Sequence, residues 1–482
     1  MELWSSRFGF ILAAIGSAVG IGNIWRFSAV LGQNGGGAYL IPYLIAVFLF
    51  AMPLMMLELS MGRHFRATVV SAFKNVRPRF NVIGWLLCAT VFLILSYYLV
   101  ITGWTLAYVV SSASGQIESF ARFTGSYEPV LYFIMTAAVT GVVVSAGVRK
   151  GIEKISTVMI PFCVGILALM AVYATTLPGF AEGITFFLSP DFSVLANPLI
   201  WSAAFGQAFF SLSVGEGILI TYGAYMDRET VIPYSAIIIT VADLVVALMA
   251  GAVIFPIVFT FGLEPTIGAE LAFSTLPKAF ALMPGGYLLG ILFFLVLFFA
   301  GLTSAVSMLE VTVAAIREAT GLSRRIIAAL LTALVMIAGM PSALSYSALG
   351  LRFDDIRILD FMDETVGELG LPVSAFLIAV IFTWFIPRTA LGSQIDGGGV
   401  WLRLVWLMCR YIIPAVLIVT TAARLLSGVD FAGWRFIPGT ESIGSLLQGT
   451  GALIIFAMLI VIILAFCRLK GCRIPPHLRG WR

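Results

Sequence analysis

Long apolar runs recur from one end of the chain to the other and are separated by short polar loops. A run of roughly 20 apolar residues is long enough to cross the ~30 Å hydrocarbon core of a bilayer as a helix. The pattern therefore predicts an all-α polytopic membrane protein with twelve transmembrane helices. Their centres lie near Val19, Phe48, Ile94, Ala138, Ile166, Ser211, Ala247, Leu297, Ala333, Ala375, Ala415 and Leu459.

The first and sixth predicted helices contain glycine clusters at their middles, at residues 16–23 and 211–217. A helix in lipid must satisfy its own backbone hydrogen bonds, so an interruption survives only where the freed groups line a cavity or bind a ligand. Two such interruptions are typical of a transporter built from two structural repeats. The alternative is that the glycines serve only close helix packing. Packing alone does not need the neighbouring Asn23, Ser211 and Ser213.

Composition supports a membrane location. Of the 482 residues, 60% are hydrophobic and 11% are charged, and the mean hydropathy is +1.05, far from the values of a soluble domain. Basic residues accumulate in cytoplasmic loops, and here alternate loops are richer, so both termini are expected in the cytoplasm. The formal net charge of +4 is therefore explained by the basic cytoplasmic loops, and nucleic-acid binding is not expected. The basic loops carry Arg63, Arg66, Lys74, Arg77 and Arg79, then Arg149, Lys150 and Lys154, then Arg317, Arg324 and Arg325, and the tail from Arg468 to Arg482.

Catalytic chemistry is not indicated by the sequence. The two histidines, His64 and His477, fall in loops, and no phosphate-binding loop motif is present. Three of the five cysteines fall in predicted helices and two in the tail, so no extracellular disulfide is expected. We therefore expect that the protein is not an enzyme. An ion channel is the alternative from a different class, although two separated interruptions fit a closed site better than an open pore.

The interruptions also indicate what is bound. Half-helix ends attract an anion at an N-terminus and a cation at a C-terminus, and carbonyl and hydroxyl oxygens suit a hard cation. A zwitterionic amino acid together with Na⁺ would satisfy both kinds of end.

Short motifs that together resemble those of one protein family occur along nearly the whole chain. They are WSSR (4–7), GIGNIWRF (20–27), NGGGAY (34–39), PY (42–43), ELSMGR (58–63), YY (97–98), GIEK (151–154), GQ (206–207), TY (221–222) and FAGLTS (299–304). Together they resemble the motifs of neurotransmitter:sodium symporters, in particular the prokaryotic branch that transports amino acids.

The resemblance implies the leucine-transporter fold, an inverted five-plus-five repeat with broken helices 1 and 6 and two additional helices. It implies one transmembrane domain over residues 1–482, with repeat one at about 5–175, repeat two at about 196–387 and helices 11 and 12 at about 403–470. The implied function is sodium-coupled symport of a hydrophobic or neutral amino acid by alternating access. The implied location is the plasma (cell inner) membrane, where the protein would contact lipid. A homodimer is one implied oligomeric state.

The same resemblance implies two sodium sites. The first would also use the substrate carboxylate, which would couple the ion to the substrate; its protein ligands are Ala18, Asn23, Ser211 and Asp243. The second would tie the first helix to the eighth through Gly16, Val19, Ala300, Thr303 and Ser304. For the two hydroxyls of the second site, the alternative is a hydrogen bond back to their own helical turn.

Asp243 stands where many relatives have asparagine. An ionisable side chain among apolar residues is costly and marks a functional site. In chloride-dependent relatives a chloride balances charge near the first sodium, at positions that match Tyr43, Gln207 and Ser211. A carboxylate at Asp243 could supply that charge, so no chloride requirement is predicted. The alternatives are an Asp243 that reaches a cytoplasmic vestibule or that carries a proton.

The substrate type follows from Gly20, where monoamine carriers of the family have aspartate. Glycine leaves room for a substrate carboxylate, with the Gly22 amide and the Tyr98 hydroxyl as partners. The pocket is mostly apolar, but Glu216 could recognise a positive or hydrogen-bonding side chain, as in a cationic amino acid or an amine, or could pair within the scaffold. The implied substrate-binding residues are Ser17, Ala18, Ile21, Gly22, Ile94, Tyr98, Phe210, Ser211, Ser213, Glu216, Ser304 and Met308.

Gating residues are implied in the same way. Arg26 and Asp360 match an outer pair that closes over the substrate, with Gln207 alongside. Glu58 would accept hydrogen bonds from amides freed in the sixth helix. Gly151 and Pro161 match a pattern linked to unwinding of the fifth helix. The inner-gate arginine of the family would fall on Met1, so either the inner gate differs or the start lies further upstream.

Overall fold

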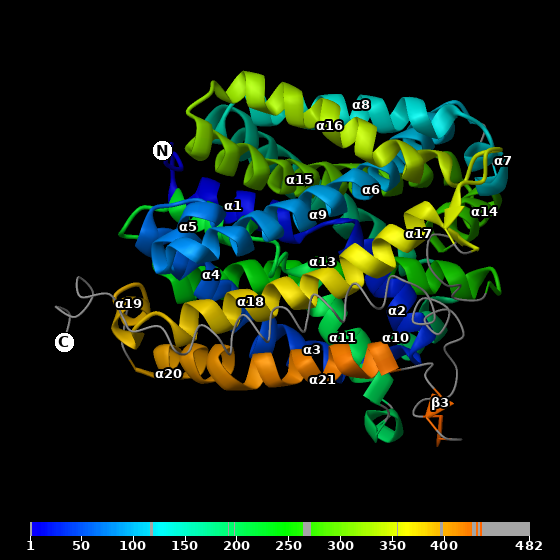
Figure 1. The fold of residues 1–482 in the computed structure, drawn as a ribbon. Helices are drawn as coiled ribbons and strands as arrows, with labels where there is room; N and C mark the ends of the chain where they lie inside the picture. The colour runs from blue at the N-terminus through cyan, green and yellow to red at the C-terminus, as the bar shows by residue number, and fades with distance from the viewer. Residues whose placement is uncertain are drawn as a thin grey trace. The chain divides into compact units, whose positions relative to one another are not determined.

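The computed structural model is almost entirely helical over the residues it describes (Figure 1). The structure describes residues 2–115, 119–190, 192–196, 198–263, 271–353, 355–395, 399–426, 430–431 and 434–435. The chain divides into two units, residues 1–415 and 416–482. The predicted twelfth helix, centred near Leu459, lies outside the described residues.

Among the described residues, nine helical segments are long and apolar enough to cross a bilayer, and a bent helix pair raises the number to ten. The nine are Gly36–Phe65, Pro78–Ala113, Glu128–Ser145, Val148–Ala174, Ile232–Thr260, Gly286–Thr320, Arg324–Leu344, Ile358–Trp384 and Val400–Thr421. The bent pair joins Arg7–Ala18 to Gly22–Gln33 at an angle of 55°. The predicted sixth helix forms two pieces that are each too short to span alone. The chain is therefore a multi-pass helical protein, with fewer described spans than the twelve predicted.

The first half of the chain contains the following helices, where η marks a 3₁₀- or π-helical segment. They are α1 (Arg7–Ala18), η1 (Gly22–Arg26), α2 (Phe27–Gln33), η2 (Gly36–Tyr39), α3 (Leu40–Ile45), η3 (Ala46–Ala51), α4 (Met52–Phe65), α5 (Val69–Val76), η4 (Pro78–Phe80), α6 (Asn81–Ala113), α7 (Phe120–Gly125), α8 (Glu128–Ser145), η5 (Val148–Glu153), α9 (Lys154–Ala174), α10 (Phe180–Leu188) and η6 (Phe192–Ala196).

The second half continues with further helices and two short antiparallel strand pairs, β1 with β2 and β3 with β4. The elements are α11 (Pro198–Ser211), α12 (Ile218–Ala224), α13 (Ile232–Thr260), η7 (Leu271–Thr275), α14 (Leu276–Leu282), α15 (Gly286–Thr320), α16 (Arg324–Leu344), β1 (Arg352–Phe353), β2 (Ile356–Arg357), α17 (Ile358–Met362), η8 (Asp363–Gly370), α18 (Leu371–Trp384), α19 (Arg388–Gly392), α20 (Val400–Leu407), η9 (Met408–Ile412), α21 (Ile413–Leu426), β3 (Asp430–Phe431) and β4 (Trp434–Arg435).

The spans of residues 7–174 and those of residues 198–384 follow the same order. Each half begins with an interrupted helix and continues with four helical spans. The predicted repeat boundaries and the inverted relation between the halves stay predictions.

Helix α1 lies in the interior of the first unit, where it contacts α9, α13 and α15. Most of its residues are buried, and many of them are glycine, alanine or serine. Small residues let helix backbones approach closely in membrane proteins. This packing brings the first glycine cluster against α15 and α13, which carry the other polar residues of the site.

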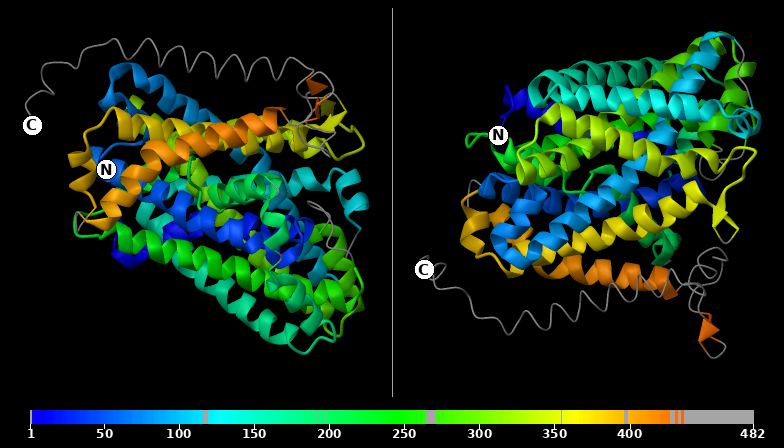
Figure 2. Two further views of the ribbon diagram at one scale, coloured as in Figure 1. Left: turned by 90° about the horizontal axis from the view of Figure 1, so that it is seen from below. Right: turned by 45° about the horizontal axis from the view of Figure 1, so that its top comes forward.

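The outer helices carry exposed apolar side chains. Helices α8 and α16 run side by side and pack on α6 (Figures 1 and 2). Val142 on α8, Leu169 on α9 and Ile337 on α16 are 68%, 58% and 70% exposed. An apolar surface of this extent is a liability in water but suits a lipid environment. The exposure therefore agrees with the membrane location inferred from composition.

Candidate functional site

The second glycine cluster forms a true gap in the helix. Six residues, 212–217, separate α11 from α12. Ser213, Gly215 and Gly217 have φ of 50°, 88° and 73°, a region that glycine enters without steric cost and that would end an α-helix. The amide of Gly215 donates a 2.7 Å hydrogen bond to Oε1 of Glu58 on α4. Glu58 is fully buried and accepts a hydrogen bond from an amide freed in this gap, as the resemblance implied.

The first interruption falls at Val19 and Gly20, between α1 and η1. Here the amide of Gly20 donates to Oδ1 of Asn23 at 3.0 Å, and the amide of Ile21 donates to the Tyr98 hydroxyl at 3.2 Å. A side chain thus satisfies each freed amide. Gly20 is required by close approach, because a Cβ atom there would lie 2.9 Å from both the Tyr98 hydroxyl and Ser304 Oγ.

Asn23, Ser211 and Asp243 form a buried cluster where the two interruptions meet α13. Asn23 Nδ2 donates to Ser211 Oγ at 2.8 Å and to Asp243 Oδ1 at 2.6 Å. Ser211 Oγ donates to Asp243 Oδ2 at 2.7 Å, and the Tyr43 hydroxyl lies 3.4 Å from Ser211 Oγ. Three residues predicted for the first sodium site therefore contact one another directly. Carboxylate, hydroxyl and amide oxygens are ligands that suit a hard cation.

The residues predicted for the second sodium site lie where α1 meets α15. Ser304 Oγ donates to the carbonyl of Ser17 at 3.0 Å and lies 3.4 Å from that of Gly16. A Cβ atom at Gly16 would lie 3.3 Å from Cβ of Thr303, so the two helices are in contact. The Thr303 hydroxyl donates to its own turn, at Phe299 and Ala300, and its oxygen keeps a free lone pair. The groups that meet between these two helices are carbonyl and hydroxyl oxygens, which suit a hard cation.

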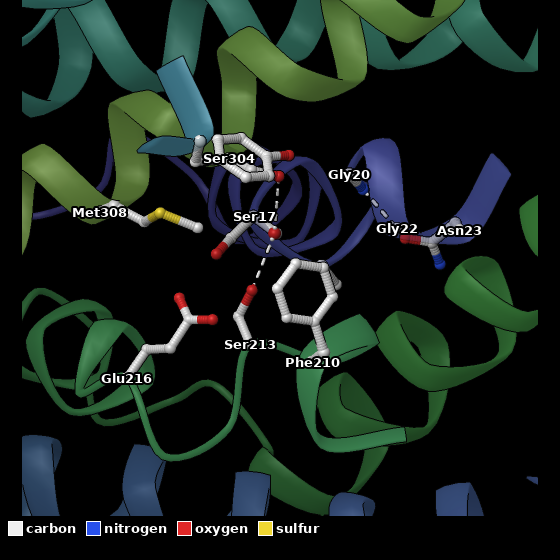
Figure 3. A pocket seen from close by; sticks show the side chains of 11 residues that line it. Ser17, Gly20, Gly22, Asn23, Phe210, Ser213, Glu216, Ser304 and Met308 are labelled. Atoms are coloured by element: carbon white, nitrogen blue, oxygen red, sulfur yellow. Dashed lines mark hydrogen bonds between the residues drawn. The ribbon is translucent and has the colours of Figure 1, made fainter. Parts of the chain in front are cut away.

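A cavity of about 10 Å³ lies between the two interruptions (Figure 3). This volume holds about one water molecule, so an amino acid needs the surrounding side chains to move apart. The predicted Ile21, Ile94 and Ser211 are buried but do not line the cavity. The lining residues are Ser17, Ala18, Gly20, Gly22, Asn23, Tyr98, Phe210, Ser213, Glu216, Ser304 and Met308, and all but Gly20 and Asn23 belong to the predicted substrate set.

Phe210 covers the cavity on one side, and the Arg26 guanidinium lies 5.0 Å from the centre of its ring. Gln207 Nε2 donates to the carbonyl of Gly22 at 3.0 Å. The predicted partner of Arg26 was wrong: its ion pair is with Glu368, at 2.5 Å, whereas Asp360 accepts hydrogen bonds from the Tyr346 hydroxyl at 2.9 and 3.1 Å. Asp360 and Glu368 are eight positions apart in the span, and of these two acids Glu368 is the one that pairs with Arg26.

Gly151 and Pro161 lie in a helical span, and the unwinding implied for them stays a prediction. The span Val148–Ala174 is helical throughout, with Pro161 inside α9. A Cβ atom at Gly151 would lie 2.0 Å from the carbonyl oxygen of Val143. In this structure Gly151 therefore serves close packing of η5 against α8.

At the N-terminal end of α1, near Trp4, the helices are joined by contacts that the sequence analysis did not identify. Trp4 Nε1 donates to the carbonyl of Tyr222 at 3.2 Å, and the two rings pack edge to face at 5.0 Å. The Tyr225 hydroxyl donates to Oε1 of Glu310 at 2.7 Å, and Glu310 is ion-paired with Arg324. The signal was present in Glu310, an acid within an otherwise apolar helix. Met1, the predicted position of a missing inner-gate arginine, lies outside the described residues.

Two interrupted helices around a buried polar cluster and a small cavity define a class of protein, the secondary transporters. The sequence profile of the sodium:neurotransmitter symporter family matches residues 1–119 and 122–469. The chain belongs to this family. It is a transporter and not an enzyme.

Individual relatives agree with this assignment. The chain is 35% identical over 433 residues to the uncharacterized sodium-dependent transporter YhdH of Bacillus subtilis, covering 86% of this chain and 96% of that protein. It is also 35% identical over 466 residues to an uncharacterized sodium-dependent transporter of Methanocaldococcus jannaschii, covering 90% and 93%. The crystal structure of MhsT in complex with L-phenylalanine is similar with a TM-score of 0.82 and 37% identity, covering 88% of this chain and 99% of that one.

Proposed function

We propose that this protein couples the uptake of an amino acid to Na⁺ by alternating access and does not require chloride. The observation that carries the proposal is the buried contact of Asn23 and Ser211 with Asp243. It joins both interrupted helices to α13, because the Asn23 amide nitrogen and the Ser211 hydroxyl each donate to the Asp243 carboxylate. The family supports sodium-coupled transport, and the finer assignments below rest on this chain's own residues.

The first sodium would be held by Asn23, Ser211 and Asp243 together with the carbonyl of Ala18. Asp243 is fully buried, and its charge would compensate the bound cation without an added anion. This is the reason to propose independence from chloride. The cation would in turn stabilise a carboxylate that is otherwise costly in a low-dielectric interior.

The second sodium would bind between α1 and α15, at Gly16, Thr303 and Ser304. Because these residues join two helices, loss of the ion would weaken the contact that holds α1 in place. The two closures seen here, Phe210 with Arg26 on one side and Trp4 with Tyr222 on the other, would then open in turn. A site that opens to only one side at a time is what coupled transport requires.

The α-carboxylate of the substrate would lie beside Gly20, Gly22 and the Tyr98 hydroxyl. Gly20 contributes by having no side chain, since a Cβ atom would meet Tyr98 and Ser304 at 2.9 Å. The substrate ammonium would meet the carbonyl of Ser17 and the hydroxyl of Ser213, which are 2.9 Å apart. MhsT, which is similar along most of its length, was crystallised with an amino acid, L-phenylalanine.

Uptake of radiolabelled amino acids into proteoliposomes tests the proposal. Three external solutions would be compared: sodium chloride, potassium chloride and sodium gluconate. The expected result is uptake that requires Na⁺ and is unchanged when gluconate replaces chloride. Equal uptake in Na⁺ and K⁺ would refute the sodium coupling, and loss of uptake in gluconate would refute the role given to Asp243.

A further inference from the structure

Glu216 is a buried carboxylate that the rest of the structure does not use. It lies in the gap between α11 and α12 and is 1% exposed. Neither of its side-chain oxygens has a hydrogen-bond partner among the described residues. The cost of burying an unpaired carboxylate is large, so such groups are normally paired or bound to a ligand.

A purely structural role does not account for Glu216. The freed amide of Gly215 in the same gap is bonded to Glu58 and not to Glu216. The ion pairs given by the described residues, Arg26 with Glu368 and Arg324 with Glu310, involve other acids. No lysine, arginine or histidine is among the described residues that line the cavity next to Glu216.

The position of Glu216 in the cavity shows which part of a substrate it would meet. Figure 3 shows Gly20, Gly22 and Asn23 at one end of the site and Glu216 with Met308 at the other, with Ser17 and Ser213 between them. A substrate whose carboxylate lies at the glycine end would direct its side chain toward Glu216. Ser17 Oγ, which also lines the cavity, is likewise without a partner among the described residues.

We propose that Glu216 accepts a hydrogen bond from the end of the substrate side chain, so that the substrate is an amino acid with an apolar stem and a terminal N–H or O–H donor. This inference rests on the proposed amino-acid transport. Met308 would contact the stem, and Glu216 would bind the donor. A site built around an unpaired buried acceptor rejects analogues that lack the donor, because binding them leaves the acceptor unsatisfied.

Matched ligand pairs test the inference on the wild-type protein. Tyrosine and phenylalanine differ by one hydroxyl, and lysine and norleucine differ by one ammonium. Competition of these compounds for Na⁺-dependent binding to purified protein would give their relative affinities. We expect the donor-bearing member of at least one pair to bind at least ~10-fold more tightly, the ratio that corresponds to about 1.4 kcal/mol. Tighter binding of the apolar member in both pairs, or equal binding within both, would overturn the inference.

Variants connect the preference to this side chain. Glu216→Met replaces the carboxylate by an apolar side chain of similar length. In the ligand pair whose donor-bearing member the wild-type protein prefers, this variant is expected to reduce or reverse the preference. Glu182→Gln, at an exposed acid on α10, is the matched control and should keep it. A preference that survives Glu216→Met would also overturn the inference. Na⁺-dependent binding of only the apolar members would refute this inference and leave the proposed function standing, whereas binding of any member without Na⁺ dependence would refute the proposed function.

Discussion

Asn23 and Asp243 are joined by a 2.6 Å hydrogen bond although 220 positions separate them in the chain. The bond fixes the first helix interruption to the middle of α13. Ser211, from the second interruption, contacts both residues. The buried carboxylate of Asp243 therefore contacts polar groups from both interrupted helices. Removing its charge should weaken cation binding more than it destabilises the fold.

Asp243→Asn should weaken Na⁺ activation of substrate binding by at least ~10-fold, about 1.4 kcal/mol, because the cation loses its only nearby counter-charge among the cluster side chains. Asparagine keeps nearly the same shape and can still contact Ser211. The measurement is the Na⁺ dependence of substrate binding to purified protein. Asp355→Asn, at an exposed position, is the matched control. An unchanged Na⁺ dependence in Asp243→Asn would argue against a sodium ion at this cluster.

Gly20→Ala should reduce substrate affinity by ~10-fold or more. The added Cβ atom would lie 2.9 Å from the Tyr98 hydroxyl and Ser304 Oγ, and the Tyr98 hydroxyl would have to shift from the position proposed to face the substrate carboxylate. Equilibrium binding gives the affinity. Gly165→Ala on α9, where nothing lies within 4 Å of an added Cβ, should bind normally. Normal binding by Gly20→Ala would show that this region does not contact the carboxylate.

Arg324→Ala should destabilise the protein by about 3–5 kcal/mol, because it leaves the buried charge of Glu310 unpaired. The thermal unfolding midpoint in detergent would report the loss. Arg325→Ala changes the exposed neighbouring arginine and should leave the midpoint almost unchanged. A second change, Glu310→Gln, should recover part of the loss in the Arg324→Ala background. Equal midpoints for the two arginine variants would mean that the Glu310 pair contributes little.

Glu368→Gln should speed substrate dissociation by roughly 3- to 10-fold, a cost of about 1 kcal/mol that is at the upper end for a partly exposed ion pair. The charge of Glu368 holds Arg26 over Phe210, so its loss frees the lid. Dissociation of a radiolabelled ligand after dilution measures the rate. Asp360→Asn should have a smaller effect, since Asp360 contacts Tyr346 instead. A larger effect of Asp360→Asn would support the pairing of Arg26 with Asp360 that the sequence suggested.

Features that depend on local composition were predictable from the chain. The length of each apolar run gives most of the described spans, and the position of glycine gives the two interruptions near residues 16–23 and 211–217. The family followed from short motifs at fixed spacing and is confirmed. The resemblance to the family grouped Asn23, Ser211 and Asp243 at one implied sodium site, and the structure brings the three side chains into contact.

Contacts between distant helices were not predictable to the same degree. The sequence placed Asp360 opposite Arg26, but a π-helical stretch and the packing of the span Ile358–Trp384 bring Glu368 there instead. The span contains several acids, and the rotation of the helix about its axis determines which of them pairs with Arg26. The pairing of Glu310 with Arg324 was missed for the same reason.

By itself, then, the sequence determined which segments are helical, where two helices are interrupted and which residue types surround the interruptions, because these follow from local hydrophobicity and backbone freedom. Only the tertiary structure decided which buried charges find partners. Helix rotation and depth set those contacts, and they depend on the packing of the whole first unit. For this reason the sequence left open whether Glu216 contacts the substrate or pairs within the scaffold. The structure shows it buried, lining the cavity and without a partner among the described residues.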